Sequence, residues 1–91
     1  MKPNVVIINL RDNVAVILED VKEGDIINLP NGKMFTARSD IPYSHKVALK
    51  DIEAGGYIYK YGEVIGAVKE NIRKGDWIHT HNLDIEAKVE E

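Results

Sequence analysis

The sequence predicts a small all-β domain of short strands, and three observations support this prediction. Short apolar runs rich in β-branched residues recur along the chain, and polar or glycine-containing turns separate them. Only one segment, residues 67–73, is a helix candidate, and at about two turns it is too short to be stable without tertiary packing. A chain of 91 residues forms one domain, so we expect residues 1–91 to fold together with at most one short helix.

Composition limits the partners and the metal ligands that this chain can use. A net charge of −3, with acidic and basic residues mixed along the chain, provides no basic stripe for a nucleic-acid backbone. The chain has no cysteine, which leaves His, Asp and Glu as the side-chain metal ligands. The apolar run from Val5 to Leu10 is far too short to span a bilayer and lacks a small-residue cleavage site. We therefore expect a cytoplasmic protein with neither a nucleic-acid nor a membrane partner.

A β-hairpin is predicted at the start of the chain. The β-branched runs Val5–Leu10 and Val14–Glu19 flank the polar triplet Arg11-Asp12-Asn13, which has turn propensity. Asp12 and Asn13 either close this turn through hydrogen bonds from their side chains to the backbone or contribute to a functional site. Both interpretations stay open, and we keep the two residues as substrate-binding candidates.

A second hairpin and a single strand follow. Pro30-Asn31-Gly32 is a strong turn signal between the predicted strands Asp25–Leu29 and Lys33–Arg38. After a loop, the segment His45–Lys50 alternates in the manner of a strand, with His45 as its first residue.

The last third of the chain contains the remaining predicted strands. Tyr57–Tyr61 and Glu63–Ile65 flank Gly62, which indicates a turn between two strands. Three of the four tyrosines alternate along the first of these strands, a pattern typical of an interface or a core edge. The segment Asp84–Val89 alternates again and is predicted to be the final strand.

One turn pattern occurs three times, at Val21–Gly24, Ile52–Gly55 and Ile72–Gly75. An apolar residue, two polar or small residues and a glycine lead into an extended run. The glycine can adopt positive φ without a steric cost, so each copy is predicted to be a tight turn that starts a strand. The uneven spacing argues against a solenoid and favours a compact fold that reuses one turn.

The segment from Trp77 to Asn82 contains the strongest signal for chemistry. If residues 76–81 are extended, Trp77, His79 and His81 share one face, with successive same-face Cα atoms about 6.5 to 7 Å apart. Two neighbouring imidazoles can then hold one divalent ion or bracket one substrate, and a third ligand would come from His45 or another chain. The alternative is that the two histidines are half-exposed residues without a role.

Several motifs together resemble a known family. The run Lys60-Tyr61-Gly62-Glu63, which continues to Ile65-Gly66, and the ending Gly75-Asp76-Trp77-Ile78-His79-Thr80-His81-Asn82 are the most specific of them. They are preceded by His45-Lys46-Val47-Ala48-Leu49 and by Asp12-Asn13-Val14-Ala15-Val16. In this order they resemble the small N-terminal SAF domain of the altronate and galactarate dehydratases, over the stretch from Asp12 to Leu83. The resemblance implies an all-β SAF-domain fold, which is called a β-clip.

The resemblance also implies a partner. In the full-length enzymes this domain precedes a much larger one, whereas in two-subunit lyases such as sulfolactate sulfo-lyase it is a separate polypeptide. Since the chain stops at Glu91, we expect the small subunit of a two-component sugar-acid dehydratase, inactive without its large subunit. The alternatives are a sulfolactate sulfo-lyase small subunit, a truncated chain, and a non-catalytic SAF-like module that binds a carbohydrate or a protein. Assembly into a homo-oligomer also stays open.

The implied reaction is β-elimination from a hydroxy or sugar acid, which removes the proton α to the carboxylate and the β-hydroxyl as water. Such a step needs a base, an acid and stabilisation of the enediolate, usually by a divalent metal or several cationic donors. We expect His79 and His81 to act as catalytic acid and base or as ligands to Fe, Mn or Mg. The expected substrate-binding residues are His45, Lys60, Asn82, Asp12 and Asn13.

Overall fold

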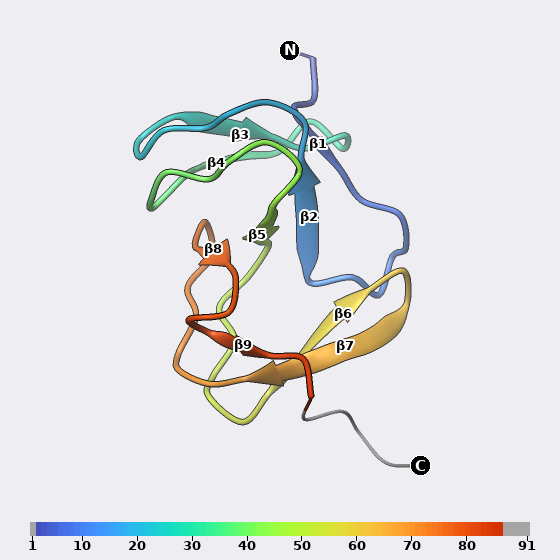
Figure 1. The fold of residues 1–91 in the computed structure, drawn as a ribbon. Coiled ribbons are helices and arrows are strands. Elements are labelled where there is room, and N and C mark those ends of the chain that lie inside the picture. Colours follow the sequence, from blue (N-terminus) through green and yellow to red (C-terminus); the bar gives the residue numbers. More distant parts are fainter. Residues whose placement is uncertain (1, 87–91) are drawn as a thin grey trace.

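The structure, a computed structural model, describes residues 2–86 and contains only short antiparallel strands (Figure 1). The strands of this part of the chain are β1 (Val5–Val6), β2 (Val14–Ile17), β3 (Ile26–Asn28), β4 (Met34–Thr36), β5 (Lys46–Ala48), β6 (Tyr57–Lys60), β7 (Glu63–Val68), β8 (Trp77–Ile78) and β9 (Leu83–Asp84). The predicted all-β class is confirmed. Within residues 2–86 there is no helix long and apolar enough to cross a membrane.

A four-stranded sheet in the order β1-β2-β5-β8 forms the centre of the domain (Figure 1). Val14 pairs with Ala48 across β2 and β5, and Val47 pairs with Trp77 across β5 and β8. Val47 and Ala48 are adjacent and both are fully buried. Because adjacent strand residues point to opposite faces, this sheet is covered on both sides.

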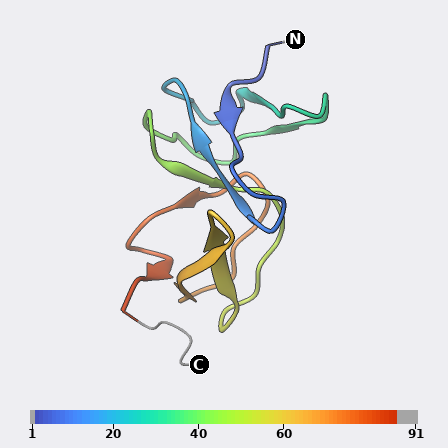
Figure 2. The ribbon, with the colours of Figure 1, turned by 90° about the vertical axis from the view of Figure 1, so that its right-hand side faces the viewer.

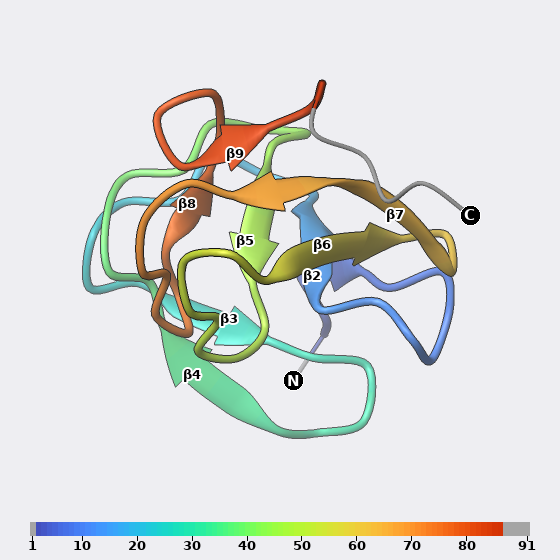
Figure 3. The same cartoon turned by 90° about the horizontal axis from the view of Figure 1, so that it is seen from below.

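Two smaller sheets supply the cover. The β3–β4 ribbon lies toward one face of the central sheet, and β6, β7 and β9 form a three-stranded sheet toward the other, as Figures 1 and 3 show. The buried apolar residues accordingly form two clusters. One cluster joins Ala15, Ile17 and Val47 to Ile27, and the other joins Val14, Ala48 and Ile78 to Ile58, Val68 and Leu83.

The turn pattern seen three times in the sequence occurs four times in the structure. The fourth copy begins at Ile41 and places Ser44, with φ of 69°, where the other copies have glycine. The apolar first residues pair across the fold as isolated bridges, Val21 with Ile41 and Ile52 with Ile72. The sequence pattern did not reveal the fourth copy, because a serine and not a glycine occupies the position with positive φ.

The bridges show that the domain is built from two similar halves, residues 14–44 and 45–75. The N–H of Gly24 donates to the carbonyl of Ala37 over 2.9 Å, and the N–H of Gly55 donates to the carbonyl of Val68 over 2.9 Å, at the same interval in the chain. The side-chain caps repeat as well.

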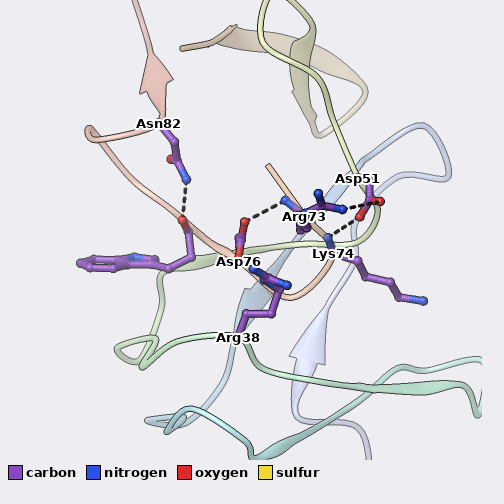
Figure 4. Close-up of polar contacts among 7 residues, drawn as sticks. Arg38, Asp51, Arg73, Lys74, Asp76 and Asn82 are labelled. Atoms are coloured by element: carbon purple, nitrogen blue, oxygen red, sulfur yellow. Dashed lines mark hydrogen bonds and ion pairs between the residues drawn. The ribbon is translucent and has the colours of Figure 1, made fainter. Parts of the chain in front are cut away.

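Asp20 accepts a hydrogen bond from the N–H of Tyr43, and Asp51 accepts one from the N–H of Lys74. Figure 4 shows the second of these caps. Each half is therefore a clasp closed by its own hydrogen bonds, and the pairing of β2 with β5 joins the two clasps.

The structure differs from three sequence predictions, a helix and two strand boundaries. The helix predicted over 67–73 is wrong, because Val68 pairs with Leu83 and the N–H of Ile72 donates to the carbonyl of Ile52. Their backbone groups are thus used by β-type partners. The first hairpin forms, but its first strand ends at Val6. Of the final strand predicted over residues 84–89, only Asp84 is in a strand, β9, which begins at Leu83. Residues 85–86 form a turn, and residues 87–89 lie outside the described residues.

Candidate functional site

Four aromatic side chains meet at the edge of the central sheet. The ring of Trp77 stacks on that of His79, with centroids 5.1 Å apart, and lies 5.5 Å from the ring of His81. The ring of His45 lies 5.6 Å from that of Trp77 and 5.2 Å from that of His79. We call His45, His79 and His81 the imidazole cluster, with Trp77 in contact with all three.

Strand pairing explains why His45 joins the other two histidines. Lys46 of β5 pairs with Ile78 of β8, so the residue before Lys46 and the residue after Ile78 meet at the same end of the strand pair. Those residues are His45 and His79. The imidazole cluster therefore combines two segments that are far apart in the sequence.

A hydrogen bond links two of these rings. The indole Nε1 of Trp77 donates to Nδ1 of His45 over 3.1 Å. Trp77, His45 and His79 are half-buried, whereas His81 is exposed. The cluster is thus a partly open surface feature and not an enclosed cavity.

A tight turn, and not a regular strand, presents His79 and His81. The prediction that residues 76–81 are extended is wrong, because β8 ends at Ile78 and residues 80–82 form a turn. Asn82 is 4% exposed and fixes this turn. Its side-chain oxygen accepts the N–H of His79 over 2.9 Å, and its amide nitrogen donates to the carbonyl of Trp77 over 2.8 Å, a bond drawn in Figure 4.

The candidates Asp12 and Asn13 lie against a different element. Asn13 is 6% exposed, and its side chain accepts the N–H of Tyr59 over 2.8 Å and donates to the carbonyl of Tyr57 over 2.9 Å. Asp12 accepts the N–H of Gly62 over 2.8 Å. Both side chains brace the β6–β7 hairpin, so their role in substrate binding stays a prediction.

Two lysines form a separate cationic pair. The pKa of Lys46 is lowered from 10.5 by burial and, second, by the positive charge of Lys60. Lys60 also lies over the ring of Tyr61, with its Nζ 4.9 Å from the centroid. The ion pairs found among residues 2–86 include neither lysine. Lys46 was not among the predicted site residues, since a lysine in an alternating strand has no sequence signal for burial.

The described residues do not complete a metal site. Among them, no group of three or more His, Asp or Glu side chains is arranged to hold an ion. The imidazole cluster has three rings, but Nδ1 of His45 is already occupied by the indole N–H. Ligation of Fe, Mn or Mg by His79 and His81, with further ligands from another chain, stays a prediction.

Fold and site together define a small all-β domain that carries a histidine cluster at the edge of its central sheet. Comparison with known families then places it more closely. The chain belongs to the altronate/galactarate dehydratase SAF domain family, whose model matches residues 3–86. The resemblance seen in the sequence motifs is confirmed.

The relatives are lyases of two kinds. The chain is 41% identical over 75 residues to altronate dehydratase of Escherichia coli (strain K12). The aligned region covers 82% of this chain and 15% of that enzyme. It is 46% identical over 69 residues to galactarate dehydratase (L-threo-forming) of the same organism, which covers 74% of this chain and 12% of that enzyme. The chain thus spans less than a sixth of either dehydratase.

A third relative is a separate subunit. The chain is 49% identical over 47 residues to (2R)-sulfolactate sulfo-lyase subunit alpha of Paracoccus pantotrophus, which covers 52% of this chain and 70% of that subunit.

Proposed function

We propose that this chain is the small subunit of a two-component sugar-acid dehydratase of the altronate/galactarate type. In this proposal it contributes the imidazole cluster to an active site shared with a separate large subunit. Family membership supports the class of reaction, since the relatives are lyases. The observation that carries the proposal is the convergence of His45, His79 and His81 on Trp77.

The need for a large subunit follows from the exposure of the imidazole cluster to solvent. β-Elimination α to a carboxylate requires a site from which most water is excluded. Here His81 is exposed and its two companions are half-buried, so the described surface is one wall of such a site. The large subunit supplies the opposite wall, and the isolated 91-residue chain is inactive.

Each group has a role in the elimination. One imidazole of the pair His79 and His81 takes the proton from the carbon α to the carboxylate. The other gives a proton to the β-hydroxyl, which leaves as water, and the resulting enol becomes a 2-keto-3-deoxy acid. A cationic group must offset the charge of the substrate carboxylate, and Lys60, together with its neighbour Lys46, suits that task.

A second candidate function is that of a sulfolactate sulfo-lyase small subunit. The observation in its favour is that the match covers 70% of the length of the sulfo-lyase alpha subunit, but less than a sixth of either dehydratase. Sulfite would then leave in place of water. A non-catalytic SAF-like module that binds a carbohydrate or a protein is the outcome to expect if neither substrate class is turned over.

The test is co-expression with the large lyase chain encoded in the same genome. The purified pair, and each chain alone, would be assayed with altronate, galactarate and sulfolactate. Release of a 2-keto-3-deoxy acid by the pair, but by neither chain on its own, supports the dehydratase proposal. Release of sulfite supports the sulfo-lyase alternative. A large chain that is fully active without this one would contradict both forms of the proposal.

A further inference from the structure

We propose that Trp77 holds His45 in the neutral tautomer protonated at Nε2, so that His45 donates a hydrogen bond to a substrate oxygen and is not a metal ligand. This inference deepens the proposed function and rests on it for the identity of the ligand, an oxygen of a hydroxy acid. In this scheme Trp77 is a positioning residue that acts through His45.

The first step is the direction of the hydrogen bond. An indole nitrogen is only a donor, because its lone pair belongs to the ring. The 3.1 Å contact from Nε1 of Trp77 to Nδ1 of His45 therefore requires a lone pair on Nδ1. A neutral imidazole has one donor and one acceptor nitrogen, so the proton of His45 resides on Nε2.

The second step concerns metal binding. An imidazole ligates a metal through a nitrogen lone pair. In this tautomer Nδ1 faces the indole N–H, and Nε2 has its proton. Moving the proton to Nδ1 to free Nε2 would set two N–H groups against each other and leave both half-buried donors unpaired. His45 is thereby removed from the set of ligands considered for a third metal contact.

The third step is the contrast with His79. Nδ1 of His79 lies 3.3 Å from the hydroxyl oxygen of Thr80, and a hydroxyl can either donate or accept. Nδ1 of His79 can therefore act either as a donor or as an acceptor toward this hydroxyl. The two adjacent rings, 5.2 Å apart, thus have different chemistry, a fixed donor on His45 and an adaptable imidazole on His79.

The fourth step is placement. His45 precedes β5, and its ring is in contact with both Trp77 and His79, which limits rotation about the side chain. A positioned N–H at the edge of the cluster suits an oxygen acceptor, either the carboxylate of a hydroxy acid or the oxyanion that forms when the α-proton leaves.

The direct test is the imidazole spectrum of the 15N-labelled 91-residue chain, from two-bond 1H–15N correlations. We expect Nδ1 of His45 in the region of an unprotonated nitrogen and Nε2 in the region of a protonated one. In Trp77→Phe, which keeps an aromatic ring but lacks the N–H, His45 should become a mixture of tautomers. Addition of Zn²⁺ should shift the His45 signals in Trp77→Phe and leave them in place in the wild type.

Two substitutions of His45 test its role as a donor in the assembled enzyme. His45→Asn keeps an acceptor at the Nδ1 position and removes the outer donor, whereas His45→Gln keeps an amide donor near the Nε2 position. We expect kcat/KM to be at least tenfold higher for His45→Gln than for His45→Asn. Equal values, or a His45→Asn enzyme within threefold of the wild type, would overturn the donor role.

The tautomer and the proposed function fail in different ways. A wild-type His45 that is protonated at Nδ1, or that shifts with Zn²⁺ as strongly as in Trp77→Phe, overturns the inference whatever the enzyme does. Absence of turnover with every large subunit contradicts the proposed function, while the spectrum still decides the tautomer. Should Trp77→Phe unfold, the position of the wild-type Nδ1 and Nε2 signals is sufficient to support or overturn the tautomer.

Discussion

The side-chain oxygen of Asn82 accepts the backbone N–H of His79 over 2.9 Å, and this bond fixes the turn that presents two of the three clustered histidines. The other end of the same amide donates to the carbonyl of Trp77. A single buried asparagine therefore controls both the geometry of the site and the end of β8.

Replacement of Asn82 by alanine should lower the free energy of unfolding by about 1 to 3 kcal/mol, since it leaves buried backbone groups without partners. Urea unfolding at 25 °C would measure the loss. Asn31 is a matched control, because its side chain caps the N–H of Lys33 in an exposed turn. Asn31→Ala should lower the free energy of unfolding clearly less than Asn82→Ala does. Equal decreases in the two variants would show that the burial of Asn82 makes no additional contribution to stability.

Gly75 and Gly24 provide a pair that separates backbone strain from close packing. Both have positive φ, at 94° and 92°. A Cβ on Gly75 would lie 2.6 Å from the carbonyl oxygen of Thr36, whereas a Cβ on Gly24 would have no atom within 4 Å.

Gly24→Ala should therefore cost about 1 to 2 kcal/mol through its left-handed backbone alone. Gly75→Ala should cost more, because the carbonyl of Thr36 must also move. The difference between their urea midpoints is the measurement. If the two alanine variants unfold at the same urea concentration, the packing of Gly75 against β4 is not tight.

Lys46 should make stability depend on alkaline pH. Its pKa is lowered by burial and then by Lys60, so the folded state binds this proton more weakly than the unfolded chain does. The free energy of unfolding therefore increases as the pH rises through the folded-state pKa, and this gain is complete above 10.5.

Lys46→Met should remove that part of the pH dependence and stabilise the protein at pH 7. The gain should not exceed about 1 kcal/mol, because solvent screens a half-exposed ammonium. Lys60→Met should produce a smaller change, since burial is the larger cause. A pH profile identical in wild type and Lys46→Met would contradict the assignment.

His79→Ala and His81→Ala should each lower kcat of the assembled enzyme by at least about 100-fold, the usual range for loss of a general acid or base. Folding should be nearly intact, because neither side chain is in the apolar clusters. Circular dichroism and co-purification with the large subunit are the controls. Assembled activity within about threefold of wild type for both, about 0.65 kcal/mol in the barrier, would exclude a catalytic role.

The local parts of the fold could be predicted from the sequence, and the long-range parts could not. Turn residues such as Pro30-Asn31-Gly32 and Gly62 located their hairpins, since turn geometry is a local property. The fourth turn was missed because Ser44 adopts a backbone conformation usually reserved for glycine. The apparent helix failed because backbone partners of residues 67–73 come from Ile52, Gly56 and Leu83, which no local pattern reveals.

The same distinction applies to the site. The neighbouring pair His79 and His81 was visible in the sequence, although a turn and not a strand presents it. The contact of His45 with this pair depends on β5 lying beside β8, a pairing between segments distant in sequence. The bond from Trp77 to His45 depends in turn on side-chain placement, for which the sequence has no signal.

The two clasps have a kinetic consequence. In each half the closing contact joins two residues of that half, Val21 with Ile41 and Ile52 with Ile72. Each of these contacts can therefore form without the other. Figure 2 shows the β3–β4 ribbon in the upper part of the view and the β6–β7 hairpin in the lower part. These contacts join residues closer in sequence than the β2–β5 pairs that join the two halves, so their entropic cost of closure is lower and each half should close before the halves are joined. Amide exchange should then reveal two cooperative units, residues 14–44 and residues 45–75.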